Sequence, residues 1–294
     1  MNSWCSSFNG IDKESWVMGR HARLAPTEDR RQANNENRRP TLSLIIGELL
    51  LTIGGLALLF AFYESYWTNI ESARIQAQVS DKLDQEWETQ RANPRQKLTV
   101  ELGSAFARMY VPAFGSDFNF AIVHGTDEED LLAGPGHYAD TQLPGEKGNF
   151  AVAGHRVGKG APFNDLGKLK SCDAIVVETE TAWNTYRVLP IGENQEQRAA
   201  DARNCLSPEQ AERVINGDYS NVFGRYITLP TDVATIGAKP GIDDHTATDD
   251  MEPVMTLTTC HPQFSNAERM IVHAMLVESH PKDGAYRPAV LEES

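Results

Sequence analysis

From about Lys97 onward, the chain consists of short runs rich in β-branched and aromatic residues, separated by Gly, Pro and Asp. Short runs with frequent turn signals are typical of antiparallel all-β folds. About eight such runs predict a closed or nearly closed antiparallel β-barrel. They are Phe106–Val111, Phe118–Val123, Asn149–Ala153, Ala174–Thr179, Ala182–Leu189, Tyr226–Leu229, Val254–Thr259 and Met270–Val277.

Two helices are expected to interrupt these strands. The first is short and covers Asp127–Ala133. The second begins at Ser207-Pro-Glu-Gln210, a capping box with proline at the first helical position, and should run to Gly217.

An apolar segment, residues 42–63, precedes the β-rich part and contains one charged residue, Glu48. At a rise of about 1.5 Å per residue, its length matches the hydrocarbon core of a bilayer. The alternative is a cleaved signal peptide. The segment is long for one, and Phe62-Tyr-Glu-Ser-Tyr-Trp67 follows it in place of a small-residue cleavage site. The sequence therefore favours one uncleaved transmembrane helix.

Positive charge around the segment predicts its orientation, because arginines and lysines are retained on the cytoplasmic side. Five arginines lie shortly before it, and only Arg74 and Lys82 follow within a similar distance. We expect a single-pass protein of the cell membrane, with residues 1–41 as a disordered cytoplasmic tail and the rest extracellular. The five arginines are Arg23, Arg30, Arg31, Arg38 and Arg39.

Residues 64–95 are expected to form a helical stalk. Ile75, Val79, Leu83 and Trp87 recur every fourth residue, which is the pattern of one helix face, and Pro94 ends it. The barrel is then assigned to residues 96–280, and residues 281–294 to a C-terminal tail.

Composition excludes some functions. The formal net charge of -14 argues against nucleic-acid binding, which requires clustered Lys and Arg. The four cysteines, Cys5, Cys172, Cys205 and Cys260, include no CxxC pair, so no structural zinc site is expected. We expect neither a metal nor another cofactor.

Cys260 ends the β-type run Thr256-Leu-Thr-Thr-Cys260, and Arg269 begins the next run. If the two strands pair antiparallel, the thiol and the guanidinium flank the connecting loop and lie close together. His155 follows another run, Phe150-Ala-Val-Ala-Gly154, at a strand end. A thiolate nucleophile, an imidazole proton shuttle and a cation for a developing oxyanion are the groups that acyl transfer needs. Each residue alone also fits a structural role, as a disulfide cysteine, a surface histidine or a solvated arginine.

Together the residues define a resemblance. Gly148-Asn-Phe-Ala-Val-Ala-Gly-His155-Arg, Thr256-Leu-Thr-Thr-Cys260 and Glu268-Arg269 resemble signatures of the sortase family, the cysteine transpeptidases of Gram-positive cell surfaces. Gly134-Pro-Gly-His-Tyr138, Leu143-Pro-Gly145 and Ala161-Pro-Phe-Asn-Asp-Leu166 match as well. The stretch Cys260-His-Pro-Gln-Phe-Ser-Asn-Ala-Glu-Arg269 is most similar to the actinobacterial class E branch.

The resemblance implies a mainly β fold: an eight-stranded sortase-type barrel with short helices, preceded by the transmembrane helix. It implies that Cys260 attacks the Thr–Gly bond of a C-terminal LPxTG- or LAxTG-like sorting signal and forms a thioacyl intermediate. His155 would act as general acid and base, and Arg269 would stabilise the oxyanion or position the substrate. The partners would be surface proteins bearing such signals and the amine of a peptidoglycan precursor of the lipid II type.

Four further residues are expected to bind substrate. Tyr110 stands where the class E branch reads the second signal residue, although a buried strand tyrosine fits equally. His137 would border the groove or pack in the core. Thr258 and Thr259 precede the nucleophile in its signature. His261 should point away from the Cys260 face, because strand neighbours alternate, and His273 should be structural.

The chain departs from the family at about residues 192–224, which resemble an insertion containing Cys205. Cys172 stands where the family often has glycine. One hypothesis is a Cys172–Cys205 disulfide that clamps the insertion onto the barrel, as an exported protein permits.

Two other functions stay open. A thiol hydrolase or protease on the same barrel would cleave the signal without joining it to an amine. A non-enzymatic wall-binding or metal-binding surface domain would use His155, Cys260, His261 and His273.

Overall fold

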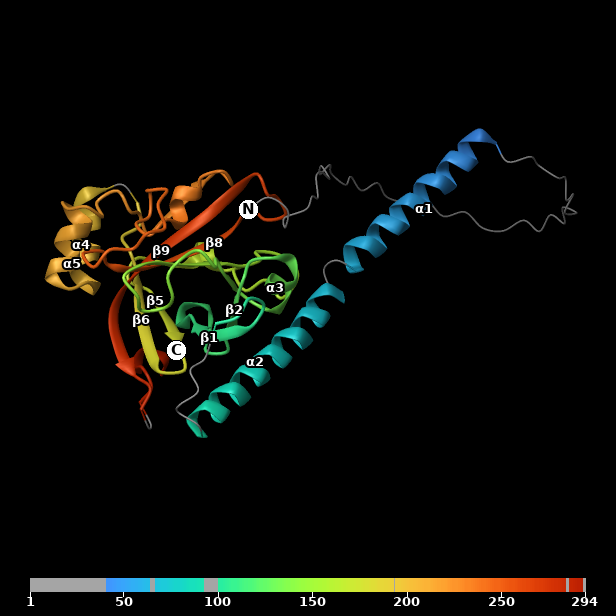
Figure 1. The fold of residues 1–294 in the computed structure, drawn as a ribbon. Coiled ribbons are helices and arrows are strands. Elements are labelled where there is room, and N and C mark those ends of the chain that lie inside the picture. The colour runs from blue at the N-terminus through green and yellow to red at the C-terminus, as the bar shows by residue number, and fades with distance from the viewer. Residues whose placement is uncertain (1–40, 64–66, 93–99, 193, 284–285, 293–294) are drawn as a thin grey trace, which may run out of the picture. The chain divides into compact units, whose positions relative to one another are not determined.

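A computed structural model describes residues 41–63, 67–92, 100–192, 194–283 and 286–292. Apart from Thr41, the predicted tail lies outside these residues. The strands form one sheet in the order β6-β5-β1-β2-β3-β4-β8-β9-β7, and a further β6–β9 pairing closes it into a barrel (Figure 1). The strands are β1 (Ala105–Tyr110), β2 (Asn119–His124), β3 (Gly136–His137), β4 (Gly148–Ala153), β5 (Ala174–Glu178), β6 (Ala182–Val188), β7 (Arg225–Thr228), β8 (Pro253–His261) and β9 (Glu268–Pro281).

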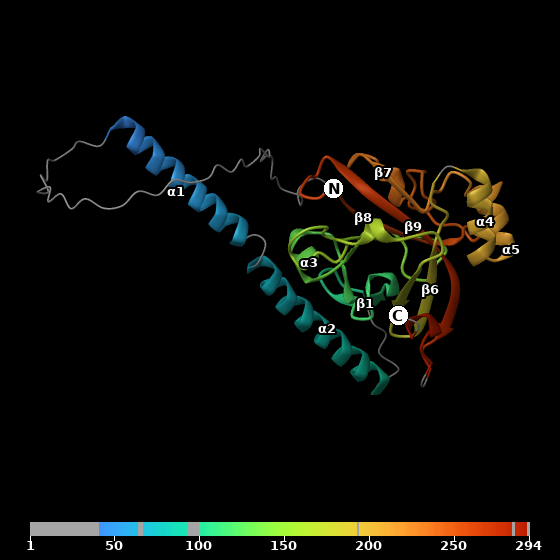
Figure 2. The same cartoon turned by 180° about the vertical axis from the view of Figure 1, so that it is seen from behind.

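Closure depends on the length of β9. One edge of this strand pairs with β8 over residues 268–275. Its other edge pairs first with β7, over residues 269–272, and then with β6, over residues 274–281. Eight strands therefore form the closed barrel, and β7 extends the sheet beside the start of β9 (Figure 2).

All eight predicted runs are strands, and the predicted closed barrel is confirmed. The expectation that the barrel is antiparallel throughout is wrong, because β2 pairs with β3 and β4 with β8 in parallel. Crossover connections, not hairpins, link these parallel neighbours. The sequence did not predict β3, because its two residues are too short to establish a period of two.

The two faces of each strand have different surroundings. The barrel interior is apolar and includes Phe150 and Val152 from β4, Leu257 from β8, and Val272 from β9, all buried. Alternate residues of the same strands face outward, among them Thr256 and Thr258. Several of these outward positions are also buried, because loops and helices cover the outside of the barrel.

The predicted stalk is the helix α2 (Thr68–Ala92), and it packs on the barrel. Leu83 and Trp87 are buried against β1 and β2, in a cluster that contains Ala105, Ala121 and Val123. Arg108 Nη2 strengthens this packing by donating to Asp84 Oδ1 and Ser80 Oγ, each at 2.9 Å. The helix is thus part of the barrel unit. The apolar helix α1 (Leu42–Phe62) belongs to a separate unit and is described by itself.

Three short helices cover the barrel. The α3 helix (Glu128–Ala133) is capped at its N-terminus by Asp127, the first residue of the predicted helix. The α5 helix (Pro208–Ile215) has the predicted capping box at Ser207 and Gln210 and ends near the predicted Gly217. The α4 helix (Gln195–Cys205) was not predicted, because its sequence is polar and lacks an apolar period. With residues of β8 and β9, α4 and α5 form a second apolar cluster beside β9.

Short 3-10 turns complete the chain. They are η2 (Pro112–Phe114), η3 (Leu166–Lys168), η4 (Val233–Ile236) and η5 (Ala289–Leu291). The η4 turn lies over the outer face of β4, where Ile236 contacts the cluster of Ala151 and Ala153.

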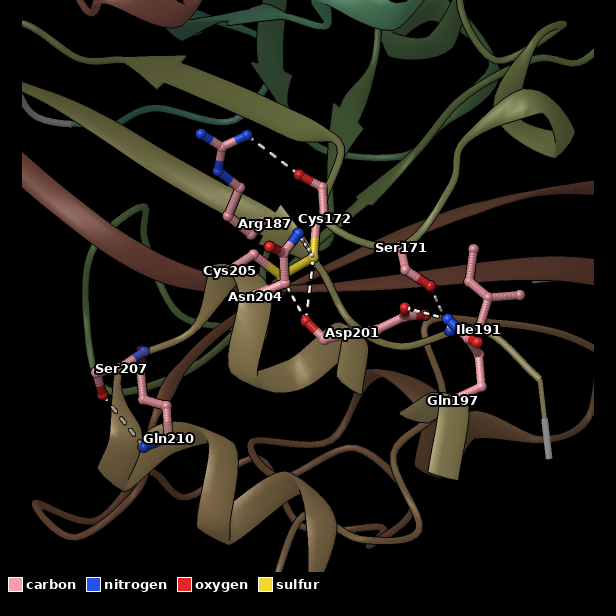
Figure 3. Close-up of a disulfide and its surroundings, with 10 residues drawn as sticks. All are labelled: Ser171, Cys172, Arg187, Ile191, Gln197, Asp201, Asn204, Cys205, Ser207 and Gln210. Carbon is pink, nitrogen blue, oxygen red and sulfur yellow. Dashed lines mark hydrogen bonds between the residues drawn. A yellow bond between two sulfur atoms is a disulfide. The ribbon is translucent and has the colours of Figure 1, made fainter. Parts of the chain in front are cut away.

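The hypothesised disulfide is confirmed. Cys172 and Cys205 are bonded, with their Cα atoms 5.5 Å apart (Figure 3). Cys172 lies just before β5, and Cys205 ends α4. The bond therefore fastens the insertion to the barrel, and Arg187 Nη1 on β6 donates to the Cys172 carbonyl at 3.1 Å.

Removing this disulfide should lower the free energy of unfolding. For a sequence separation of 33 residues, the chain-entropy relation gives a loss of about 4 kcal/mol. The measurement is urea unfolding of the double variant Cys172→Ser/Cys205→Ser under oxidising conditions. Asn204→Ala, which alters a neighbour of Cys172 Sγ without touching the bond, serves as control and should cost less than about 1 kcal/mol. Equal midpoints for the double variant and the native chain would show that the bond does not clamp the insertion.

Candidate active site

Three neighbouring strands bring His155, Cys260 and Arg269 together. β4 runs parallel to β8, and Ala153 is paired with Thr258. Continuing both strands by two residues places His155 beside Cys260. β8 and β9 are antiparallel, and Cys260 is directly paired with Arg269. The three predicted catalytic residues thus form one row across the outer face. They are only 3%, 2% and 1% exposed, respectively.

Gly154 lets the Phe163 ring approach the chain closely just before His155. A Cβ at this position would lie 2.6 Å from the buried Phe163 ring, so only glycine lets the ring pack there. The Phe163 amide donates to the His155 carbonyl at 3.0 Å. The Gly154 amide donates to the Thr258 carbonyl at 3.1 Å, which continues the contact between the two strands. The start of the loop after β4 is thereby folded back onto His155.

The electrostatics of His155 favour the neutral imidazole. Burial and, to a smaller extent, the Lys159 ammonium lower the pKa of His155 to about 4, against the opposing effect of Glu128. Lys159 Nζ and Glu128 Oε1 form an ion pair at 2.7 Å. At neutral pH the resting side chain can therefore accept a proton, which is the state a general base needs.

Arg269 is held at the start of β9. Its Nη1 donates to the carbonyls of Asn266 and Glu268, at 3.1 and 3.0 Å. Burial lowers its pKa, but a guanidinium stays charged over the physiological range. A fixed cation beside the nucleophile can stabilise negative charge as it develops.

Cys260 occupies the centre of the row. The structure gives Cys260 in a disulfide, and the chemistry considered below is that of its reduced thiol. Arg156 Nη1 lies 3.2 Å from the Cys260 carbonyl, and Arg269 is the paired residue on β9. The positive charge of Arg269, paired with Cys260 on the same face, favours the thiolate, the nucleophilic form.

The two predicted threonines lie on opposite faces of β8. Thr258 faces outward one row from Cys260, and its Oγ1 lies 3.0 Å from the Tyr138 hydroxyl. Thr259 Oγ1 donates to the Gly154 carbonyl at 2.8 Å. Thr258 is thus placed on the face of the nucleophile, whereas Thr259 fastens β8 to the end of β4.

His137 and Tyr110 are not brought to this row. His137 is fully buried against Phe106 and Phe150 of the interior, and its Nδ1 lies 2.9 Å from His124 Nδ1. Tyr110 lies on β1, four strands from β8 in either direction around the barrel. Its hydroxyl donates to Glu178 Oε2 at 2.7 Å, and its ring packs on Trp183. The predicted roles of His137 and Tyr110 in substrate binding stay predictions.

Tyr138 is a residue of the site that sequence reasoning missed. Besides its contact with Thr258, it interacts electrostatically with Arg269, and burial raises its pKa. Gly134-Pro-Gly-His-Tyr138 carried the family pattern, but a loop tyrosine has no chemical signature that assigns it to a site. Its place above Thr258 makes it part of the same outer face.

The histidines of the metal-binding hypothesis are separated. His273 faces Thr256, with Nδ1 2.9 Å from Oγ1, and stands four residues from Arg269 along β9. His261 contacts Arg156. Within the described ranges, no group of three or more His, Cys, Asp or Glu side chains is arranged to hold a metal ion.

Comparison with known proteins agrees with this geometry. The sortase domain model matches residues 109–277, so the chain belongs to the sortase family, whose members are cysteine transpeptidases. It is 30% identical to sortase SrtE1 of Streptomyces coelicolor over 275 residues, covering 89% of this chain and 65% of that protein's length. Sortase SrtE2 of the same organism is 28% identical, with 83% and 85% covered. The solved structure of the SrtF sortase from Corynebacterium diphtheriae is 67% identical, with a TM-score of 0.66, and covers 69% of this chain and 98% of that one.

These relatives confirm the predicted family and its class E resemblance. They also confirm the sortase-type barrel.

Proposed function

We propose that this sortase cleaves a C-terminal LPxTG- or LAxTG-like sorting signal between Thr and Gly and joins the protein to the amine of a peptidoglycan precursor. The observation that carries the proposal is the row His155–Cys260–Arg269, in which nucleophile, proton shuttle and cation lie side by side. The row therefore offers one group for each role that acyl transfer needs, namely nucleophile, proton shuttle and oxyanion stabiliser.

The first half-reaction forms the thioester. Neutral His155 takes the proton of the Cys260 thiol, and the resulting thiolate sulfur attacks the threonine carbonyl carbon. Arg269 stabilises the oxyanion of the tetrahedral intermediate. The C–N bond to glycine then breaks, and the leaving amine takes the proton from His155.

The second half-reaction reverses these steps with another amine. The acceptor nitrogen attacks the thioester carbonyl and loses a proton to His155. The C–S bond breaks, an amide forms, and the thiolate regains its proton. Because His155 is neutral at rest, it can receive the proton of the acceptor nitrogen at neutral pH and then return it to the sulfur.

The loop between β7 and β8 is the proposed recognition site for the sorting signal. Thr228 of β7 is paired with Arg269, and the next residue, Leu229, is 61% exposed. Val233, at the start of η4, is 42% exposed, while Ile236 in the same turn packs on β4. Exposed apolar side chains beside the cation suit an extended, largely apolar peptide.

The proposed location is the cell membrane of a Gram-positive organism, single-pass, with the N-terminus cytoplasmic and the barrel extracellular. α1 supports this location, because its 21 residues have a hydropathy of 2.3 and could cross a membrane by length and composition. The arginines before α1 support the orientation. An extracellular barrel would meet lipid II-type acceptors and signal-bearing surface proteins on the same side.

The test uses signal peptides varied at the second and fifth positions, incubated with the reduced protein with and without a peptidoglycan-type amine. Mass spectrometry identifies the products. The proposal expects cleavage after Thr and a new amide when the amine is present. Free Thr carboxylate as the sole product, at every amine concentration, would identify a thiol hydrolase or protease instead.

A further inference from the structure

A second row of side chains lies next to the catalytic row of His155, Cys260 and Arg269, displaced by one residue on each chain segment. Each of its members, Arg156, His261 and Glu268, is the chain neighbour of a catalytic residue. Arg156 Nη1 lies 2.7 Å from His261 Nδ1. His261 Nε2 lies 3.9 Å from Glu268 Oε2, and the two residues are paired across β8 and β9. This set, the bracing row, crosses the same three segments as the catalytic row.

The bracing row and the catalytic row occupy different faces. His261 and Glu268 follow and precede the outward-facing pair Cys260 and Arg269, and strand neighbours alternate. The bracing side chains therefore need not touch a substrate bound over Cys260. They can act on the reaction only through the segments that they join.

Arg156 joins His155 to Cys260. Its guanidinium donates to the Cys260 carbonyl at 3.2 Å as well as to His261. Its own carbonyl accepts a hydrogen bond from Asn164 Nδ2 at 2.9 Å. Arg156 is thus held at both ends, with its backbone on the histidine loop and its guanidinium on the nucleophile strand.

We propose that Arg156, braced by His261 and Glu268, is a positioning residue that sets the separation between His155 and Cys260. This inference rests on the proposed function, in which a proton passes between these two side chains. Proton transfer requires the heavy atoms to come within hydrogen-bond reach, about 2.6–3.2 Å. A displacement of about 1 Å can reduce the rate about a hundredfold.

Steady-state kinetics of signal-peptide cleavage test the proposal in the full chain. Arg156→Ala should lower kcat about tenfold to a hundredfold, with KM changed less than about twofold and the thermal midpoint nearly unchanged. Arg187→Ala is the matched control, since it removes another guanidinium that donates to a backbone carbonyl, that of Cys172, away from the catalytic row. Its kcat should equal that of the native chain.

His261 provides a second test, independent of the folding of Arg156→Ala. His261→Asn keeps an acceptor near the position of Nδ1 and should retain most of kcat. His261→Ala removes the acceptor and should resemble Arg156→Ala. In the double variant Arg156→Ala/His261→Ala, the losses should not add, because both residues act through one contact.

Alkylation of Cys260 by iodoacetamide over a range of pH needs no sorting signal. It should be slower at neutral pH in Arg156→Ala than in Arg187→Ala, because a displaced His155 no longer accepts the proton of the thiol. Native kcat and native alkylation in Arg156→Ala would overturn the inference, as would His261→Asn being as impaired as His261→Ala. If the native chain cleaved no signal peptide, the proposed function would fail, and the alkylation rates would still decide the role of Arg156.

Discussion

The Cys260→Ala variant should lose signal cleavage and amine transfer by at least about a thousandfold, because no other group in the row can form the thioester. The variant should fold, since the change removes one sulfur atom at a strand end, and Cys260 is outside the apolar clusters of the barrel. The measurement is product formation by mass spectrometry, with the thermal midpoint as the folding control.

His155→Gln and Arg269→Ala should each also lower kcat strongly. Combining either change with Cys260→Ala should cause no further loss, because the three residues act as a unit. Cleavage at the native rate by Cys260→Ala would remove the thiol from the mechanism. Zinc uptake with undiminished binding in that variant would favour the non-enzymatic metal-binding function.

Acid should destabilise the protein between about pH 6.5 and pH 4. Burial lowers the pKa of His137 and His155 to about 4 and that of His273 to about 3. The unfolded chain therefore binds more protons than the folded one in this window. The stabilisation from neutral burial is fully present above about pH 6.5 and is lost as pH falls toward the folded pKa values. The loss should reach several kcal/mol.

Urea unfolding at several pH values measures this loss. His273→Gln removes one buried titrating group and should flatten the dependence of the free energy of unfolding on pH. The carboxylate Asp218, whose pKa Arg213 and Lys239 hold below the usual value, adds to the loss only toward the acid end of this window. A free energy of unfolding independent of pH from 7 to 4.5 would contradict the expected effect.

Much of the fold could be predicted, because alternation is a local property. The runs around Phe150 and Leu257 predicted both strands and their inward faces. The helix face of α2 followed from Leu83 and Trp87. The helix α4 could not be predicted, because Arg198, Ala199 and Ala202 pack as its buried residues without forming an apolar stripe. Its stability comes from the barrel and from the disulfide, which are not local.

For the site, the sequence predicted which catalytic residues come together when they lie near the ends of adjacent strands. Cys260 and Arg269 flank one loop, so antiparallel pairing suffices to join them. The position of Tyr110 around the barrel depends on how the sheet closes through β6 and β9, which no local pattern reveals. The contact of Arg156 with His261 likewise depends on the register of β4 against β8. Alternation indicated that His261 faces away from the nucleophile, but not what it meets there.

The disulfide described above places opposite demands on the cysteines of one domain. Cys172 and Cys205 must stay oxidised to fasten the insertion, whereas Cys260 must be reduced to attack a peptide. At the proposed extracellular location, activity therefore requires a reductant that reduces Cys260 but is too weak or too bulky to open the structural bond. The same holds during purification, because a strong reductant that reduces Cys260 would also reduce the Cys172–Cys205 bond and release α4 from the barrel.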